Sequence, residues 1–178
     1  PGGHLNPNES ITQTALRELV EKTGLAAEPS HLEQLQTYST PGRDARDTKM
    51  RVTSVAYLAF MPDPGTPRAG SDARAARFWA VDDLPEFNKA LGNDEGPILA
   101  FDHSEMLRDG LERAASKLEY TTLATAFVDE QFTISDLRHV YESVWRSGID
   151  PANFSRKVKA TPGFIDPTGV KRATGRAP

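Results

Sequence analysis

The sequence predicts an α+β protein built from two parts. Residues 1–100 combine one amphipathic helical pattern with short apolar runs rich in β-branched and aromatic residues, which are typical of strands. Residues 101–178 have helical spacing almost throughout. A length of 178 residues suits one ordinary domain or two small ones. We therefore expect a mixed domain over residues 1–100, a linker helix over 101–118 and a second domain over 119–178.

The first part is predicted to begin with a helix over residues 11–23. Ser10 and Gln13 have the spacing of a capping box, and Gly24 suits the left-handed position that ends a helix. The apolar residues of this segment repeat at helical spacing and form one stripe. Strands are predicted over residues 32–38, 52–61 and 77–81.

The second part is predicted to hold three helices and a hairpin. Thr133 precedes an amphipathic stretch, and Asp150 followed by Pro151 suits the start of another helix. We expect Phe154 and Val158 to face the core of this part, and Trp79 and Trp145 to be core residues as well. The segments are helices over 120–128, 134–145 and 151–160, and a hairpin over 164–170. This order is that of a winged helix-turn-helix, in which the last helix reads DNA and the hairpin is the wing.

Charge is distributed unevenly along the chain. Residues 151–178 carry six basic residues and one acidic residue, whereas the other 150 residues carry 15 basic and 24 acidic ones. Such asymmetry indicates a basic module that meets a polyanion, although a solvated tail would have the same composition. Asn and Arg can read base edges, and Lys more often contacts phosphate. The candidate DNA-binding residues are Asn153, Ser155, Arg156, Lys157, Lys159, Lys171, Arg172 and Arg176.

Composition excludes several other classes. Without cysteine the chain has no disulfide, no thiolate nucleophile and no Cys-ligated zinc. No apolar run approaches the roughly 18 residues of a membrane span. We expect a cytoplasmic protein that does not bind membranes. Because the sequence begins at Pro1 without a methionine, we also expect it to be a fragment that lacks its true start.

A long, gapped motif covers residues 3–25. It runs Gly3, five residues, Glu9, seven residues, then Arg17-Glu18-Leu19-Val20-Glu21-Lys22-Thr23-Gly24-Leu25. This resembles the Nudix box, Gly-x5-Glu-x7-Arg-Glu-U-x-Glu-Glu-x-Gly-U with U apolar, at every defined position except 22. The resemblance implies an α/β/α sandwich whose first strands would precede Pro1. It also implies cleavage, in active members, of nucleoside diphosphates linked to another group, with divalent metal held by the helix carboxylates.

Lys22 stands where the Nudix pattern has a metal-ligating glutamate. Glu18, Glu21 and position 22 share one helix face, where three carboxylates could hold Mg²⁺. A lysine removes one of these ligands and can pair with Glu18. Each unit of like charge at roughly 4 Å costs about 4 kcal/mol at an effective dielectric near 20. We therefore expect no catalytic residue and no required cofactor, and at most weak Mg²⁺ binding by Glu18 and Glu21.

A box without catalysis can still bind a ligand. Arg43 and Arg46 lie in the loop before the strand predicted from residue 52, and their guanidinium forks suit a pyrophosphate, although a solvated charged loop is also possible. The stretch from this loop to residue 59 resembles the ADP-ribose-handling branch of the Nudix family. The candidate ligand-binding residues are Gly3, Arg17, Glu18, Glu21, Arg43 and Arg46.

Segments from both parts together resemble the NrtR family, the Nudix-related transcriptional regulators of NAD metabolism. They include Ala100-Phe101-Asp102-His103, Lys117-Leu118-Glu119-Tyr120-Thr121 and Asn153-Phe154-x-Arg156-Lys157. The resemblance implies a sensor for ADP-ribose or a related NAD metabolite, and a homodimeric repressor of NAD synthesis or salvage genes that binds operator DNA. Two alternatives remain: a Mg²⁺-dependent ADP-ribose pyrophosphatase with an accessory C-terminal module, and an RNA-end or nucleotide scavenger, which the basic C-terminal segment does not favour.

Overall fold

The computed structural model describes residues 1–25, 31–44, 50–61, 64–88, 96–120 and 122–170. It divides into two compact units, Pro1–Gly110 and Leu111–Pro178. The elements, in chain order, are α1 (Ile11–Thr23), β1 (His31–Tyr38), β2 (Ser54–Phe60), the 3₁₀ helix η1 (Val81–Asp83), α2 (His103–Tyr120), the 3₁₀ helix η2 (Thr122–Phe127), α3 (Ile134–Trp145) and α4 (Pro151–Ala160). No helix in the described ranges is long and apolar enough to cross a membrane.

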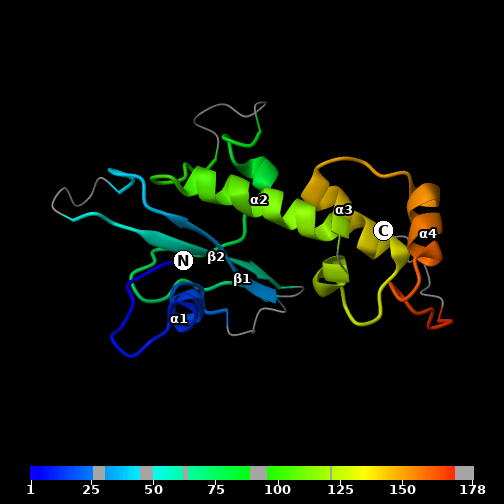
Figure 1. Cartoon of the computed structure of the whole chain (residues 1–178), viewed down its shortest axis with the longest axis horizontal. Helices are drawn as coiled ribbons and strands as arrows, with labels where there is room; N and C mark the ends of the chain where they lie inside the picture. Colours follow the sequence, from blue (N-terminus) through cyan, green and yellow to red (C-terminus); the bar gives the residue numbers. More distant parts are fainter. Residues whose placement is uncertain (26–30, 45–49, 62–63, 89–95, 121, 171–178) are drawn as a thin grey trace. The chain divides into compact units, whose positions relative to one another are not determined.

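Unit 1 has three layers, with the antiparallel sheet of β1 and β2 in the middle and a helix on each face (Figure 1). On one face, the hydroxyls of Thr12 in α1 and Tyr57 in β2 share a hydrogen bond of 2.9 Å. On the other face, the Tyr38 hydroxyl donates to Asp109 Oδ2 in the first half of α2 at 2.6 Å. Helices therefore cover both faces of the sheet, and the predicted α/β/α arrangement is confirmed.

A β-bulge in β1 explains why its apolar residues alternate imperfectly. The pairing register shifts between Gln34 and Gln36, which leaves Leu35 as the extra residue. A Cβ built on Gly110 of α2 would lie 3.7 Å from the Leu35 side chain, so Leu35 faces α2. Tyr38 faces α2 as well, although strict alternation would place residues three apart on opposite faces.

The capping signals of α1 act as the sequence predicts. The Ser10 hydroxyl accepts a hydrogen bond from the Gln13 backbone N–H at 3.2 Å, and the Gln13 side chain accepts one from the Ser10 N–H at 2.8 Å. Gly24 adopts a left-handed φ of 66°, which a residue with a Cβ would resist. Both ends of the helix that carries most of the box are therefore fixed by local sequence.

The strand predicted over residues 77–81 is wrong. Residues 77–80 form no strand, and the chain turns into η1 at Val81. Trp79 is 40% exposed rather than in the core, and the Arg77 guanidinium stacks over its ring at 3.4 Å from the centroid. The aromatic residues that suggested a strand find no neighbouring strand in the described part of the chain.

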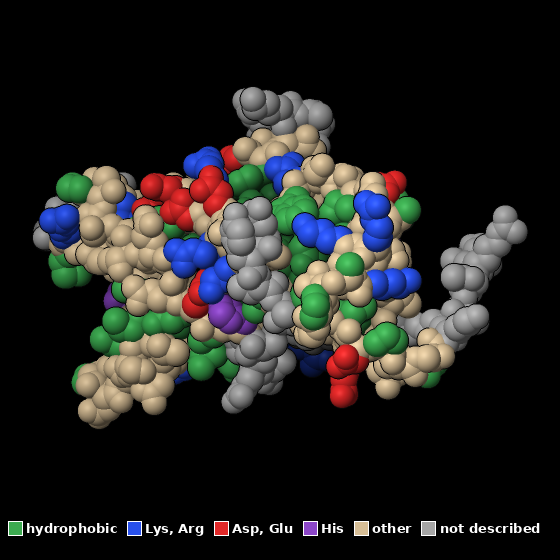
Figure 2. All heavy atoms as spheres, turned by 45° about the vertical axis from the view of Figure 1, so that its right-hand side comes forward, with side chains coloured by type: hydrophobic (Ala, Val, Ile, Leu, Met, Phe, Trp, Pro, Cys, Tyr) green, Lys and Arg blue, Asp and Glu red, His purple; other side chains and the backbone are tan. Residues whose placement is uncertain are grey.

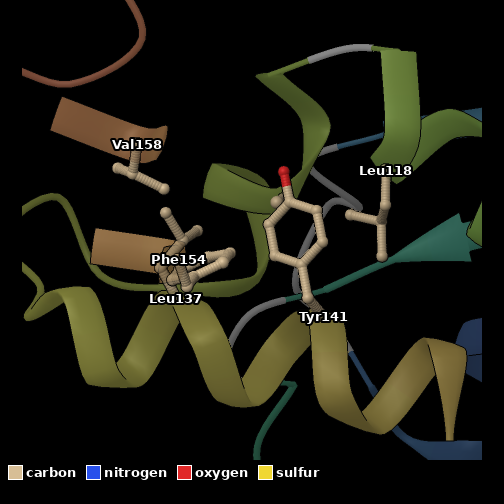
Figure 3. Close-up of a cluster of buried hydrophobic side chains, with 6 residues drawn as sticks. Leu118, Leu137, Tyr141, Phe154 and Val158 are labelled. Atoms are coloured by element: carbon tan, nitrogen blue, oxygen red, sulfur yellow. The ribbon is translucent and has the colours of Figure 1, made fainter. Parts of the chain in front are cut away.

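Unit 2 is built around the helices predicted for it, except that the segment predicted as a helix over residues 120–128 forms the shorter 3₁₀ helix η2. The Thr133 hydroxyl caps α3 by accepting from the Asp136 N–H at 3.1 Å, and Asp150 caps α4 by accepting from the Asn153 N–H at 2.7 Å. Pro151 occupies the first turn of α4. One buried cluster joins the helices (Figure 3). Its residues are Leu118, Ala124, Leu137, Tyr141, Phe154 and Val158.

Two further features of unit 2 differ from prediction. The hairpin predicted over residues 164–170 does not form within that range, where no strand is present. Gly169 nevertheless has a left-handed φ of 74°, as a turn there requires. Trp145 is 40% exposed rather than buried, although its ring packs on Tyr141 with centroids 5.1 Å apart and its Nε1 donates to the Ala115 carbonyl at 3.3 Å.

We predict that Leu137→Ala strongly destabilises unit 2. Leu137 is 0% exposed, and emptying such a site costs about 2–5 kcal/mol through lost burial and the residual cavity. Denaturant unfolding followed by circular dichroism measures the change. Val170→Ala removes an apolar side chain that is 72% exposed and should change stability by less than about 0.5 kcal/mol. Equal effects of the two substitutions would contradict this description of the core.

Candidate ligand site and DNA interface

Glu18 is the buried carboxylate at the centre of the box. The residue is 7% exposed, although it is charged. A Cβ built on Gly3 would overlap the Glu18 carboxylate, so a larger residue there would have to displace this carboxylate or the N-terminal loop. The first glycine of the motif and the first glutamate of the helix are thus in direct contact.

Arg17 holds the acidic residues of the box together. Its Nε donates to Glu9 Oε1 at 2.8 Å, and its Nη1 donates to Glu18 Oε1 at 2.7 Å. The same Nη1 donates to Glu21 Oε2, one turn further along the helix, at 3.0 Å. Nη2 donates to the His4 carbonyl at 3.0 Å and so fastens the N-terminal loop as well. One guanidinium therefore fixes the relative positions of three carboxylates.

These contacts keep Glu9 and Arg17 ionised. Hydrogen bonds from Arg17, the largest influence, lower the pKa of Glu9 to about 2. Hydrogen bonds to Glu9 and then Glu18 raise the pKa of Arg17. Protonation of Glu9, and the loss of its pairing with Arg17, therefore requires a strongly acidic solution.

Lys22 is held between two carboxylates. Its Nζ lies 3.8 Å from Glu18 Oε2, as the helical spacing predicts, and it forms a closer ion pair with Asp72. The hydrogen bond to Asp72 is the largest influence raising the pKa of Lys22, and the same bond lowers the pKa of Asp72. The ammonium therefore stays charged at neutral pH.

Asp72 was missed in the sequence because it lies 50 residues from Lys22 in a Pro- and Gly-rich loop. Backbone contacts bring it there. The Arg68 N–H donates to the Thr23 carbonyl at 2.6 Å, and the Gly70 N–H donates to the Lys22 carbonyl at 3.4 Å. A Cβ on Gly70 would overlap a backbone carbonyl of α1, so this approach also needs glycine. Nothing local to residue 72 signals the contact.

The residues present fit a divalent cation poorly. Within the described residues no three His, Cys, Asp or Glu side chains gather as a metal site. Glu18 Oε2 is buried and accepts no hydrogen bond, so it could act as a ligand, but the Lys22 ammonium lies 3.8 Å from it. The other Glu18 oxygen and Glu21 Oε2 accept from Arg17. Mg²⁺ prefers an octahedron of oxygens, which this donor set does not supply.

Arg43, the first of the two loop arginines, is buried away from the box. Its guanidinium donates to both Asp102 oxygens, at 2.7 and 2.6 Å, and to Ser54 Oγ at 2.7 Å. Ser54 pairs with Tyr38 in the sheet, and both lie on the α2 face, opposite the α1 face. The structure therefore does not bring Arg43 together with the box. Arg46 lies outside the described residues.

Helix α4 separates its apolar and basic residues. Phe154 and Val158 are buried in the unit 2 core, as predicted. Asn153, Arg156, Lys157 and Lys159 are exposed, and Ser155 is half-buried. Figure 2 shows several Lys and Arg side chains over the part of the surface formed by the C-terminal helices. Lys171, Arg172 and Arg176 lie outside the described residues.

Two side-chain contacts organise this interface. Arg156 Nη2 donates to Asn153 Oδ1 at 3.0 Å, so the two candidate base readers orient each other. Glu142 Oε1 in α3 accepts from the Ile149 N–H at 3.0 Å, and this bond is the largest influence lowering the pKa of Glu142. Glu142 was missed in the sequence as a residue that fixes the turn before α4, because its partner is a backbone group.

Two families match the chain. Residues 1–100 match the NUDIX domain, and residues 124–178 match the NrtR DNA-binding winged helix domain. The chain is 26% identical over its full length to a protein from Acinetobacter baylyi named ADPR responsive transcriptional repressor NtrR. It is 32% identical over 61% of its length to an ADP-ribose pyrophosphatase from Methanocaldococcus jannaschii. It spans 66% of the first protein and 54% of the second, less than two thirds of each.

Solved structures with both sequence and fold similarity include two of Shewanella oneidensis NrtR. One is 30% identical with a TM-score of 0.69, and the match covers 96% of this chain and 73% of the solved chain. The other, complexed with a 27mer DNA, is 28% identical with a TM-score of 0.64, and the match covers 98% of this chain and 74% of the solved chain. A MutT/nudix family protein from Enterococcus faecalis is 32% identical with a TM-score of 0.68, over 86% of this chain and 64% of its own. The chain therefore belongs to the Nudix family and carries the winged helix domain of the NrtR regulators.

Proposed function

We propose that this protein is a transcriptional repressor that binds operator DNA through α4 and releases it in response to ADP-ribose or a related NAD metabolite. The observation that carries the proposal is Lys22, whose ammonium lies 3.8 Å from Glu18 Oε2 where a hydrolase needs a third carboxylate. The winged helix match and the name of the Acinetobacter relative support the DNA-binding role. The genes controlled would be those of NAD synthesis or salvage.

The mechanism would be thermodynamic linkage between two sites. An effector that binds better when the protein is free of DNA weakens operator binding by the same factor by which DNA weakens effector binding. We propose a homodimer, whose two α4 helices would read two half-sites of a pseudo-palindrome. Gly3, Arg17, Glu18, Glu21 and Arg46 remain the proposed effector contacts, whereas Arg43 is already engaged by Asp102 and Ser54. Any Mg²⁺ on Glu18 and Glu21 would be weakly held.

A second candidate function is ADP-ribose hydrolysis. The similarity to the Methanocaldococcus pyrophosphatase favours it, and so does a box that keeps every other defined position. The C-terminal domain would then be an accessory module. Turnover of ADP-ribose with Mg²⁺ by the unaltered protein would favour this function over the first.

We predict that Arg156→Ala and Lys157→Ala each abolish a gel shift with promoter DNA of NAD-pathway genes. Both side chains are exposed on α4, and one or two lost contacts to phosphate or a base edge remove about 1–3 kcal/mol of binding each. ADP-ribose binding, measured by calorimetry, should persist. Arg74→Ala makes the same charge change at an exposed position of unit 1 and should leave the shift intact. Loss of both DNA and ADP-ribose binding would indicate misfolding, whereas a retained gel shift would show that α4 does not bind the operator.

We predict that Lys22→Glu increases affinity for Mn²⁺, a spectroscopic substitute for Mg²⁺, by at least about tenfold, or roughly 1.4 kcal/mol. The change adds a carboxylate beside Glu18 and removes the cation that competes for it. Titration followed by electron paramagnetic resonance measures the affinity. Lys22→Gln removes the cation without adding a carboxylate and should give a smaller increase. If Lys22→Glu and the unaltered protein bind Mn²⁺ equally, position 22 does not limit metal binding.

A further inference from the structure

Glu142 joins α3 to the start of α4 within unit 2. It lies three residues before the end of α3, and its Oε1 accepts from the Ile149 N–H at 3.0 Å. Ile149 directly precedes Asp150, whose side chain caps α4. One carboxylate oxygen of α3 therefore holds the backbone at the point where α4 begins.

The turn that Glu142 spans is fixed at its last residue. Arg146, Ser147 and Gly148 are exposed, and Arg146 has a left-handed φ of 52°, which a residue with a Cβ adopts at a cost. The Ile149 side chain, by contrast, packs against the buried cluster of unit 2. Because Glu142 accepts from the N–H of the same residue, both the side chain and the backbone of Ile149 are held.

Hydrogen bonds continue from this point to the candidate base readers. Asp150 Oδ1 accepts from the Asn153 N–H at 2.7 Å, and Asn153 Oδ1 accepts from Arg156 Nη2 at 3.0 Å. Asn153 and Arg156 lie in the first two turns of α4, the end at which the recognition helix of a helix-turn-helix contacts base edges. The position of Ile149 therefore determines where these two side chains lie relative to α3.

General electrostatic effects do not favour a carboxylate at position 142. It lies in the last turn of α3, where the helix dipole disfavours negative charge. Within a module that binds DNA, it would also repel the phosphates. Arg138, one turn earlier in α3, pairs with Glu142 and offsets part of this charge. The benefit specific to Glu142 is the acceptor that it gives to a half-buried backbone N–H, which needs a partner.

We propose that Glu142 is a positioning residue for operator recognition, which fixes the first turn of α4 through the Ile149 N–H and so sets where Asn153 and Arg156 meet the bases. This rests on the proposed function, in which α4 binds operator DNA. Hydrogen bonds to base edges need exact geometry, whereas phosphate contacts carry no sequence information. Loss of the Glu142 contact therefore reduces discrimination between the operator and other DNA more than it reduces DNA binding in general.

The test compares Glu142→Ala with Glu142→Gln in the full chain. Affinities are measured at one fixed salt concentration for promoter DNA of NAD-pathway genes and for a duplex of the same length and composition in scrambled order. Glu142→Ala leaves the Ile149 N–H without its acceptor and should lower the ratio of the two affinities at least about tenfold, or roughly 1.4 kcal/mol. Its affinity for the scrambled duplex should stay the same or rise, because a negative charge is removed.

Glu142→Gln loses the charge and the ion pair with Arg138 but keeps an oxygen that can accept from Ile149. Its ratio should therefore stay within about threefold of the unaltered protein. Glu130→Ala is the matched control, because it makes the same charge change at an exposed position of unit 2 outside α3 and α4. It should leave the ratio unchanged.

Circular dichroism shows whether each variant folds. If Glu142→Ala does not fold, Glu142→Asp replaces it, since this variant keeps the charge but withdraws the oxygen from Ile149, and its ratio should fall partway. An unchanged ratio in the folded variant that lacks the contact overturns the positioning role. An equal loss in Glu142→Gln also overturns it, because the charge rather than the backbone contact would then matter. A ratio of one in the unaltered protein would instead overturn the proposed operator binding, on which this inference rests.

Discussion

The guanidinium of Arg17 is the contact on which the candidate ligand site depends. It binds Glu9, Glu18 and Glu21 and also reaches a carbonyl of the N-terminal loop. Without it, three carboxylates would repel one another on one side of α1, and the buried Glu18 would lack its compensating charge. The close approach of Gly3 to Glu18 and the pairing of Lys22 with the remaining Glu18 oxygen both presuppose this arrangement.

The charge around the box bears on what it can bind. Four carboxylates, those of Glu9, Glu18, Glu21 and Asp72, face two cations, Arg17 and Lys22. The group therefore carries an excess of negative charge, and a pyrophosphate would approach it against like charge. An effector that contains a pyrophosphate therefore needs a positive charge other than Arg17 and Lys22, such as a weakly held Mg²⁺ or an arginine outside the box. Arg43 does not supply it in this structure, because both Asp102 oxygens already engage it.

Local signals in the sequence predicted α1, α3 and α4 with their caps, because a cap and an apolar stripe are set by residues three or four positions apart. Longer-range contacts left no such signal. The ion pairs of Lys22 with Asp72 and of Arg43 with Asp102 join residues 50 and 59 positions apart. Composition also gave a wrong prediction where tertiary contacts determine the secondary structure. Residues 77–81 have the residue types of a strand, but they pair with no other strand in the described part of the chain.

The pairing of Lys22 with Asp72 has an evolutionary consequence. Lysine and glutamate codons differ by a single base, so the missing ligand could in principle return by one mutation. Asp72, however, is docked on the last turn of α1 by backbone bonds from Arg68 and Gly70. A glutamate at position 22 would then face that carboxylate at close range, and the reverted protein would bear a new repulsion until residue 72 also changed. Residues 22 and 72 would therefore have to change together for a third carboxylate to enter the box without a new repulsion.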